Sequence, residues 1–85
     1  DTLKSAALAN LKLNPMLIID LSNINYIDST GLAAILTAYD FARKNNKKLF
    51  LTNISHEVMG LLKITKLDDI FEIYPDRETA LKNTN

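Results

Sequence analysis

The sequence predicts an α/β domain in which parallel strands are linked by helices. Three short apolar runs with the character of strands alternate with longer segments whose apolar residues recur at helical spacing. The order helix, strand, helix, strand, helix, strand, helix contains two strand–helix–strand units, which implies parallel strands and right-handed crossovers. The chain has 85 residues, of which 47% are hydrophobic and 24% charged, so we expect residues 1–85 to form one domain.

The first helix is predicted over residues 2–13 and the first strand over residues 16–21. Pro15 cannot continue the helix, and the apolar run after it shows little alternation, which suits a strand covered on both faces. Residues 22–27 are expected to form a loop with Ile24 and Ile27 as apolar anchors. The helical spacing of the first segment is set by Leu3, Ala6, Ala7, Asn10 and Leu11.

The clearest predicted helix begins at Asp28-Ser29-Thr30-Gly31. Each of the first three residues is able to cap free backbone N–H groups. Asn45 and Asn46 are natural left-handed terminators at the other end of this helix. Its apolar stripe is expected to be Leu32, Ile35, Leu36, Tyr39 and Ala42.

Two further strands and two further helices complete the pattern. Strands are predicted over residues 48–52 and 70–74. Ser55 is expected to cap the helix between them, and Asp76 a final short helix through Ala80 and Leu81. The stripe of the helix between the strands is Val58, Leu61, Leu62 and Thr65. Because three strands leave two exposed edges, we expect the sheet to be completed by something outside this segment.

Composition argues against several classes of function. Ten basic residues balance ten acidic ones, so there is no basic surplus of the kind that nucleic-acid binders carry. No apolar run approaches the roughly 18 residues of a membrane span, and no secretory signal opens the chain, so we expect a cytoplasmic protein. There is no Cys, no metal-ligand spacing and no glycine-rich phosphate loop, so no metal or cofactor is expected. No catalytic set can be assembled around the lone His56, so we expect no enzyme.

Residues 17–32 are the most informative stretch. A buried strand ends in Asp20-Leu21-Ser22, a loop follows, and small or polar residues open the next helix. The Ser29 hydroxyl is therefore expected to be exposed near the carboxyl edge of the sheet, where open α/β folds bind their ligands. Gly31 would let another surface approach the first turn without a side chain in the way. The alternative interpretation is that Ser29 serves only as a helix N-cap.

This stretch resembles the STAS domain family, and within it the bacterial anti-sigma-factor antagonists. The resemblance lies in a strand ending Asp-Leu-Ser, an apolar-aromatic loop and the sequence Asp-Ser-Thr-Gly-Leu over residues 28–32. Residues 47–55, 58–68 and 70–74 also resemble the later strands and helix of that family. The family normally has a pair of strands before the first helix, and we expect that N-terminal pair to be missing from this chain.

The resemblance implies a phosphorylation switch. In the family, a partner that is both an anti-sigma factor and a serine kinase phosphorylates the Ser after the Asp, which here is Ser29; Thr30 is the second candidate. The unphosphorylated domain binds the anti-sigma factor and releases the sigma factor, and a phosphatase of the PP2C type resets the phosphorylated form. Partner contacts are expected at Asp28, Ser29, Thr30, Gly31, Ala33 and Thr37, with Asp40 and Lys44 as further exposed positions.

Two other functions stay open. The domain could be the STAS module of an anion transporter or of a lipid-transport complex, where it would act as a protein-interaction domain without phosphoserine. It could instead be a small phosphotransfer or hydrolytic enzyme. A phosphoaspartyl receiver domain is a poor match, because no acidic pair precedes Asp20 to hold Mg²⁺, and a structural role for Asp20 at the strand end is favoured.

Overall fold

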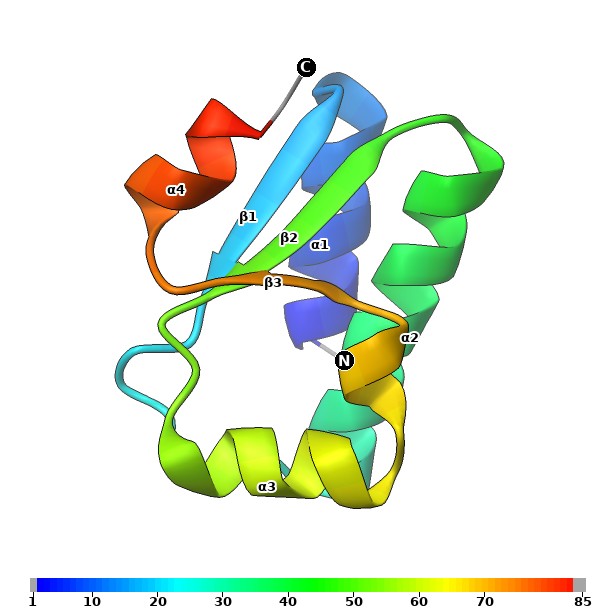
Figure 1. The fold of residues 1–85 in the computed structure, drawn as a ribbon. Helices are drawn as coiled ribbons and strands as arrows, with labels where there is room; N and C mark the ends of the chain where they lie inside the picture. Colours follow the sequence, from blue (N-terminus) through cyan, green and yellow to red (C-terminus); the bar gives the residue numbers. More distant parts are fainter. Residues whose placement is uncertain (1, 84–85) are drawn as a thin grey trace. The chain divides into compact units, whose positions relative to one another are not determined.

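The computed structural model describes residues 2–83 and confirms the α/β class with parallel strands (Figure 1). Three strands form one sheet in the order β1-β2-β3. β2 and β3 run parallel, with Phe50 opposite Glu72 and Thr52 opposite Tyr74. The elements are α1 (Thr2–Leu13), β1 (Met16–Asp20), α2 (Ser29–Lys44), β2 (Lys48–Thr52), α3 (His56–Ile64), the 3₁₀ helix η1 (Leu67–Asp69), β3 (Glu72–Tyr74) and α4 (Arg77–Lys82).

The chain divides into two compact units, of which the first holds residues up to 17 together with 27–49. Within it, α1 packs against α2 (Figure 1). The Lys47 ammonium donates a hydrogen bond to the carbonyl of Leu11 near the end of α1. The buried side chains of this unit include Ala7, Leu11, Ala34, Ile35, Ala38 and Ala42. Three of the four buried residues of α2 are alanines, so its buried face is made mostly of small side chains.

The second unit holds residues 18–26 together with those from 50 onward. The Leu21 N–H donates to the carbonyl of Thr52 at 3.0 Å, which joins the chain after β1 to the end of β2. The rings of Phe50 and Tyr74 lie edge to face on the paired strands, with centroids 5.3 Å apart. The buried side chains of this unit include Phe50, Leu51, Val58, Leu62, Leu67, Phe71 and Ala80.

Several details of the sequence interpretation are wrong. Residues 16–19 are half-buried and Asp20 is exposed, so this strand is not covered on both faces. Ile24 is 36% exposed and lies outside the buried core, whereas Ile27 is buried as expected. β3 begins at Glu72, since residues 67–69 turn as a 3₁₀ helix and leave Ile70 exposed.

The buried face of α2 is also rotated from the expected stripe. Ile35 and Ala42 are buried as predicted, but the alanines at 34 and 38 are buried with them while Leu32, Leu36 and Tyr39 are only half-buried. At its end Asn46 has the expected left-handed backbone (φ 56°), whereas Asn45 does not (φ −109°).

Within residues 2–83, no helix combines the length and the apolar character that crossing a bilayer demands.

Candidate functional site

Asp28 begins α2 as its N-cap. Its extended backbone (φ −85°, ψ 178°) turns the carboxylate onto the first turn, where Oδ1 accepts the Gly31 N–H at 2.8 Å. The Asp28 carbonyl also accepts the Leu32 N–H at 3.0 Å. Ser29 is therefore the first helical residue, and the alternative in which Ser29 itself caps the helix is not what the structure shows. The Ser29 hydroxyl therefore does not cap the helix.

A hollow of about 340 Å³ lies between α1 and the first turns of α2. Its α2 side combines the hydroxyl residues Ser29, Thr30 and Thr37 with Ala33 and Ala34, and its α1 side is Lys4. Ser29 and Thr30 are both exposed, as the sequence led us to expect for Ser29. Exposure alone does not separate the two hydroxyls as acceptors.

Gly31 lies close to a buried side chain of its own chain. A Cβ at this position would lie 3.2 Å from Ile27 Cγ2 and 3.5 Å from the capping oxygen of Asp28. The 3.2 Å contact with Ile27, a buried side chain, is shorter than an ordinary van der Waals contact. The glycine therefore lets the cap and the buried Ile27 side chain share the start of the helix.

One face of α2 is exposed along about three helical turns, and we call it the α2 face. It consists of Ala33, Thr37, Asp40 and Lys44, all of which are exposed as predicted. The Thr37 hydroxyl donates to the Ala33 carbonyl at 2.9 Å, and Lys44 pairs with Asp40 at 3.0 Å. A partner that docks here would meet a small, mixed polar surface with both charges already paired.

The loop before α2 offers two exposed apolar side chains. Tyr26 is 78% exposed and Ile24 is 36% exposed, three and five residues before Ser29. The sequence interpretation expected the loop before Ser29 to contact a partner, but it assigned Ile24 to the interior and did not single out Tyr26. Aromatic side chains of this kind are enriched at protein–protein interfaces.

Asp20 has the structural role that the sequence favoured. Its Oδ1 accepts the Ser22 N–H at 2.9 Å and the Asn53 side-chain amide at 3.2 Å. The backbone bond from Ser22, helped by the amide of Asn53, holds the pKa of Asp20 below its usual value of 3.8. Asn53 itself has a left-handed backbone (φ 56°) that sequence reasoning missed.

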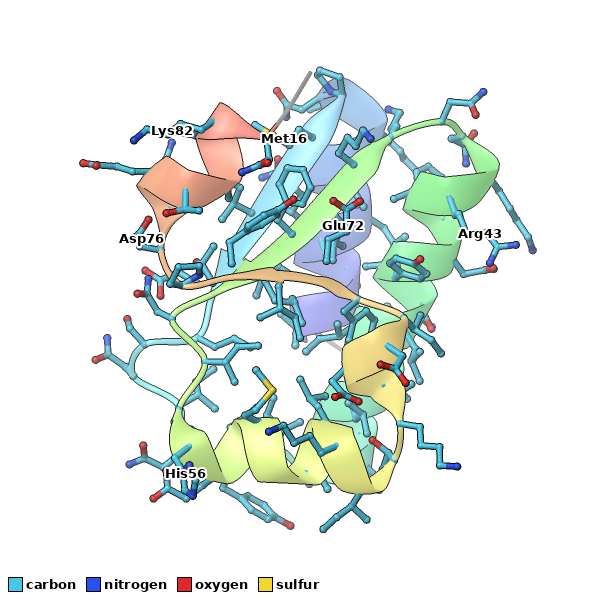
Figure 2. The ribbon with its side chains drawn as sticks, viewed as in Figure 1. Met16, Arg43, His56, Glu72, Asp76 and Lys82 are labelled. Carbon is cyan, nitrogen blue, oxygen red and sulfur yellow. The ribbon has the colours of Figure 1, made fainter. Side chains whose placement is uncertain are left out.

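His56 is exposed at the beginning of α3, as expected of a surface residue (Figure 2). Within residues 2–83, no three His, Cys, Asp or Glu side chains are grouped so that they could hold a metal ion.

Comparison with known proteins decides the family. The model of the STAS domain matches residues 2–80. The chain belongs to the STAS domain family. Membership is consistent with the order of strands and helices and with the Asp-Ser-Thr-Gly-Leu sequence at the start of α2.

Several relatives in this family have names that point to one role. An anti-sigma-B factor antagonist of Listeria monocytogenes is 40% identical over 55 residues, which cover 65% of this chain and 48% of that protein. One from Staphylococcus aureus is 31% identical over 55 residues, covering 65% of this chain and 51% of that protein. The chain thus spans about half the length of these curated relatives.

A solved structure has the same STAS-like fold. It is a Thermotoga maritima protein described as a candidate anti-sigma factor antagonist, and it superposes with a TM-score of 0.75 at 26% sequence identity. The superposition covers 76% of this chain and 56% of that one.

Proposed function

We propose that this STAS domain is an anti-sigma-factor antagonist that binds an anti-sigma factor through the loop before α2 and the α2 face. The observation that carries the proposal is the Ser29 hydroxyl, exposed and free of capping duty directly after Asp28. The names of the relatives from Listeria monocytogenes and Staphylococcus aureus support the same role. Binding would release a sigma factor, so the domain would regulate transcription through protein contacts in the cytoplasm, with no catalysis of its own.

Phosphorylation of Ser29 by a serine kinase, the anti-sigma factor itself, would switch this binding off. The Ser29 Oγ attacks the γ-phosphorus of ATP, the bond to the bridging oxygen breaks, ADP leaves, and the hydroxyl proton passes to a base of the kinase. A phosphatase of the PP2C type would hydrolyse the ester and return the domain to its binding state. Partner contacts in this proposal are Asp28, Ser29, Thr30, Gly31, Ala33 and Thr37.

The physical basis of the switch is local charge. A phosphate adds roughly −1.5 to −2 charges at neutral pH, and Asp28 already contributes a carboxylate beside it. The free N–H groups and dipole of the first turn of α2 tolerate negative charge, so the helix itself is not expected to unfold. A partner surface fitted to a neutral hydroxyl would have to desolvate the dianion. A misfit of about 1.4 kcal/mol already removes one decade of affinity.

The test is incubation of the chain with an anti-sigma factor kinase from the same genome and ATP, followed by intact-mass spectrometry and site mapping. We expect one phosphate on Ser29, none on Ser29→Ala, and wild-type modification of Thr30→Ala. The unphosphorylated chain should bind the kinase at least tenfold more tightly than the phosphorylated chain. A phosphate on Thr30 would refute the assignment of the acceptor, and equal affinity of the two forms would refute the switch.

A further inference from the structure

We propose that Lys4 binds the phosphate carried by Ser29 and holds it in the hollow between α1 and α2. The inference rests on the proposed phosphorylation of Ser29 and adds a chemical partner for the modified residue. It assigns a regulatory role to α1, a helix that contributes none of the partner contacts proposed above.

The hollow brings one cation and three hydroxyl groups together from two helices. Lys4 lies in the first turns of α1, and Ser29, Thr30 and Thr37 lie on α2. Both helices belong to the first unit and pack against each other, so this placement depends on no other part of the chain. The hollow has a volume of about 340 Å³ and is open to solvent, so a phosphate on Ser29 need not displace protein atoms to occupy it.

The charges around the hollow favour Lys4 as the partner of the phosphate. Among residues 2–83, the ion pair on α2 is the one between Asp40 and Lys44, so Lys44 already has a carboxylate beside it. The Asp28 carboxylate accepts the Gly31 N–H and adds negative charge next to Ser29. Lys4 is the cation that lines the hollow, and its side chain is exposed and not held in an ion pair with any described residue.

The chemistry of the two groups is complementary. A lysine ammonium offers three donors on a flexible stem, and a phosphate monoester offers three strong acceptor oxygens. Hydrogen bonds between such ionised groups are stronger than those between neutral ones. The modified side chain would then lie over Ala33 and Thr37 instead of extending into solvent. Phosphorylation would obstruct the α2 face by volume as well as by charge.

The test places phosphoserine at position 29 during translation, with an orthogonal tRNA and synthetase, in the full chain and in three variants. The variants are Lys4→Gln, Lys4→Arg and Lys12→Gln, the last of which removes the same charge from the far end of α1. The second ionisation of the phosphate, ordinarily near pH 6, is followed by ³¹P NMR. We expect its pKa to rise by a few tenths of a unit in Lys4→Gln and to stay at the wild-type value in the other two.

The result is independent of any kinase, because the phosphate is supplied by translation. If a kinase leaves Ser29 unmodified, the proposed function fails while this titration still reports on Lys4. Identical phosphate pKa values in the wild type and in Lys4→Gln would overturn the inference, and so would an equal rise in Lys12→Gln. Thermal unfolding of the unphosphorylated variants is expected to match the wild type, because both lysines are exposed.

Discussion

At the scale of single residues, Asp28 has two functions that mutation can separate. It caps α2 through the Gly31 N–H, and it lies beside the proposed phosphoacceptor. Asp28→Ala should lower the free energy of unfolding by about 1 kcal/mol, because the Gly31 N–H loses its acceptor. Asp28→Ser should retain most of that free energy, since a serine oxygen can also cap. Urea denaturation measures both, and an equal loss in the two variants would contradict the cap as the source.

Thr52 carries a polar group that the fold leaves unsatisfied. The residue is fully buried at the end of β2, and among the described residues its hydroxyl has no hydrogen-bond partner. Thr52→Val replaces the hydroxyl by a methyl group of similar size, so we expect the free energy of unfolding to rise by about 1 kcal/mol. The matched control is Thr37→Val on the exposed α2 face, which should change it by less than about 0.5 kcal/mol. Destabilisation of Thr52→Val in thermal unfolding would show that the hydroxyl has a partner after all.

Two carboxylates make stability depend on pH in the acid range. Hydrogen bonds from the backbone N–H groups of Ser22 and Thr79 hold the pKa values of Asp20 and Asp76 below the usual 3.8 (Figure 2 labels Asp76). A carboxyl group with a lowered folded pKa stabilises the protein above its unfolded pKa, and that stability is lost as pH falls through the folded value. Asp20→Asn and Asp76→Asn should therefore each reduce the loss of stability below pH 3.8. Denaturation midpoints measured between pH 2.5 and 5 test this. The prediction is contradicted if the double variant loses stability with falling pH as steeply as the wild type.

At the scale of elements, the helix starts and both limits of β2 could be predicted from the sequence, but the start of β3 could not. Ser55 and Asp76 cap α3 and α4 as expected, accepting the Val58 and Thr79 N–H groups at 3.2 and 2.8 Å. A cap joins residues three positions apart, so its signal is contained in the local sequence. The start of β3 was misplaced because Ile70 and Phe71 fit a strand equally well by composition. Only the 3₁₀ helix before them decides that the strand begins at Glu72.

The candidate site also has some features that the sequence predicts and some contacts that it does not. The exposure of Ser29 and of the α2 face followed from the helix periodicity and from the position of the helix start. The hydrogen bond from Asn53 to Asp20 spans 33 residues, and Lys4 lines the same hollow as Ser29 only because α1 packs against α2. Contacts of this kind depend on tertiary packing, which no local pattern records.

The loop before α2 gives a prediction for partner binding. Tyr26 is 78% exposed, so its ring contributes little to the core and is available to a partner. Tyr26→Ala should weaken binding to the anti-sigma factor at least tenfold and change the free energy of unfolding by less than about 0.5 kcal/mol. Binding by isothermal titration calorimetry decides this, with Leu13→Ala as a control at another exposed apolar position, 85% accessible, on α1. Equal effects of the two substitutions would remove the loop from the proposed interface.

At the scale of the whole molecule, the proposed switch requires that the fold stays the same in both states. The first unit already contains what would receive the phosphate: the capped start of α2, the hollow and Lys4. The chain is neutral overall, with ten basic and ten acidic residues. A phosphate dianion therefore changes the electrostatic potential near Ser29 much more than it changes the repulsion summed over the whole protein. The energy of the switch is therefore expected to appear at the partner surface and not as unfolding.

A switch that acts through local charge should change the signals of only some backbone amides on phosphorylation. In ¹H–¹⁵N spectra of the chain with serine or phosphoserine at position 29, large shift changes should be confined to residues 27–37 and the part of α1 around Lys4. Amides of α3, β3 and α4 should keep their positions, because those elements belong to the second unit and line no part of the hollow. The midpoint of thermal unfolding should change by only a few degrees. Shift changes spread over both units, or loss of cooperative unfolding, would mean that the phosphate acts by remodelling the fold, and the local charge mechanism would then be wrong.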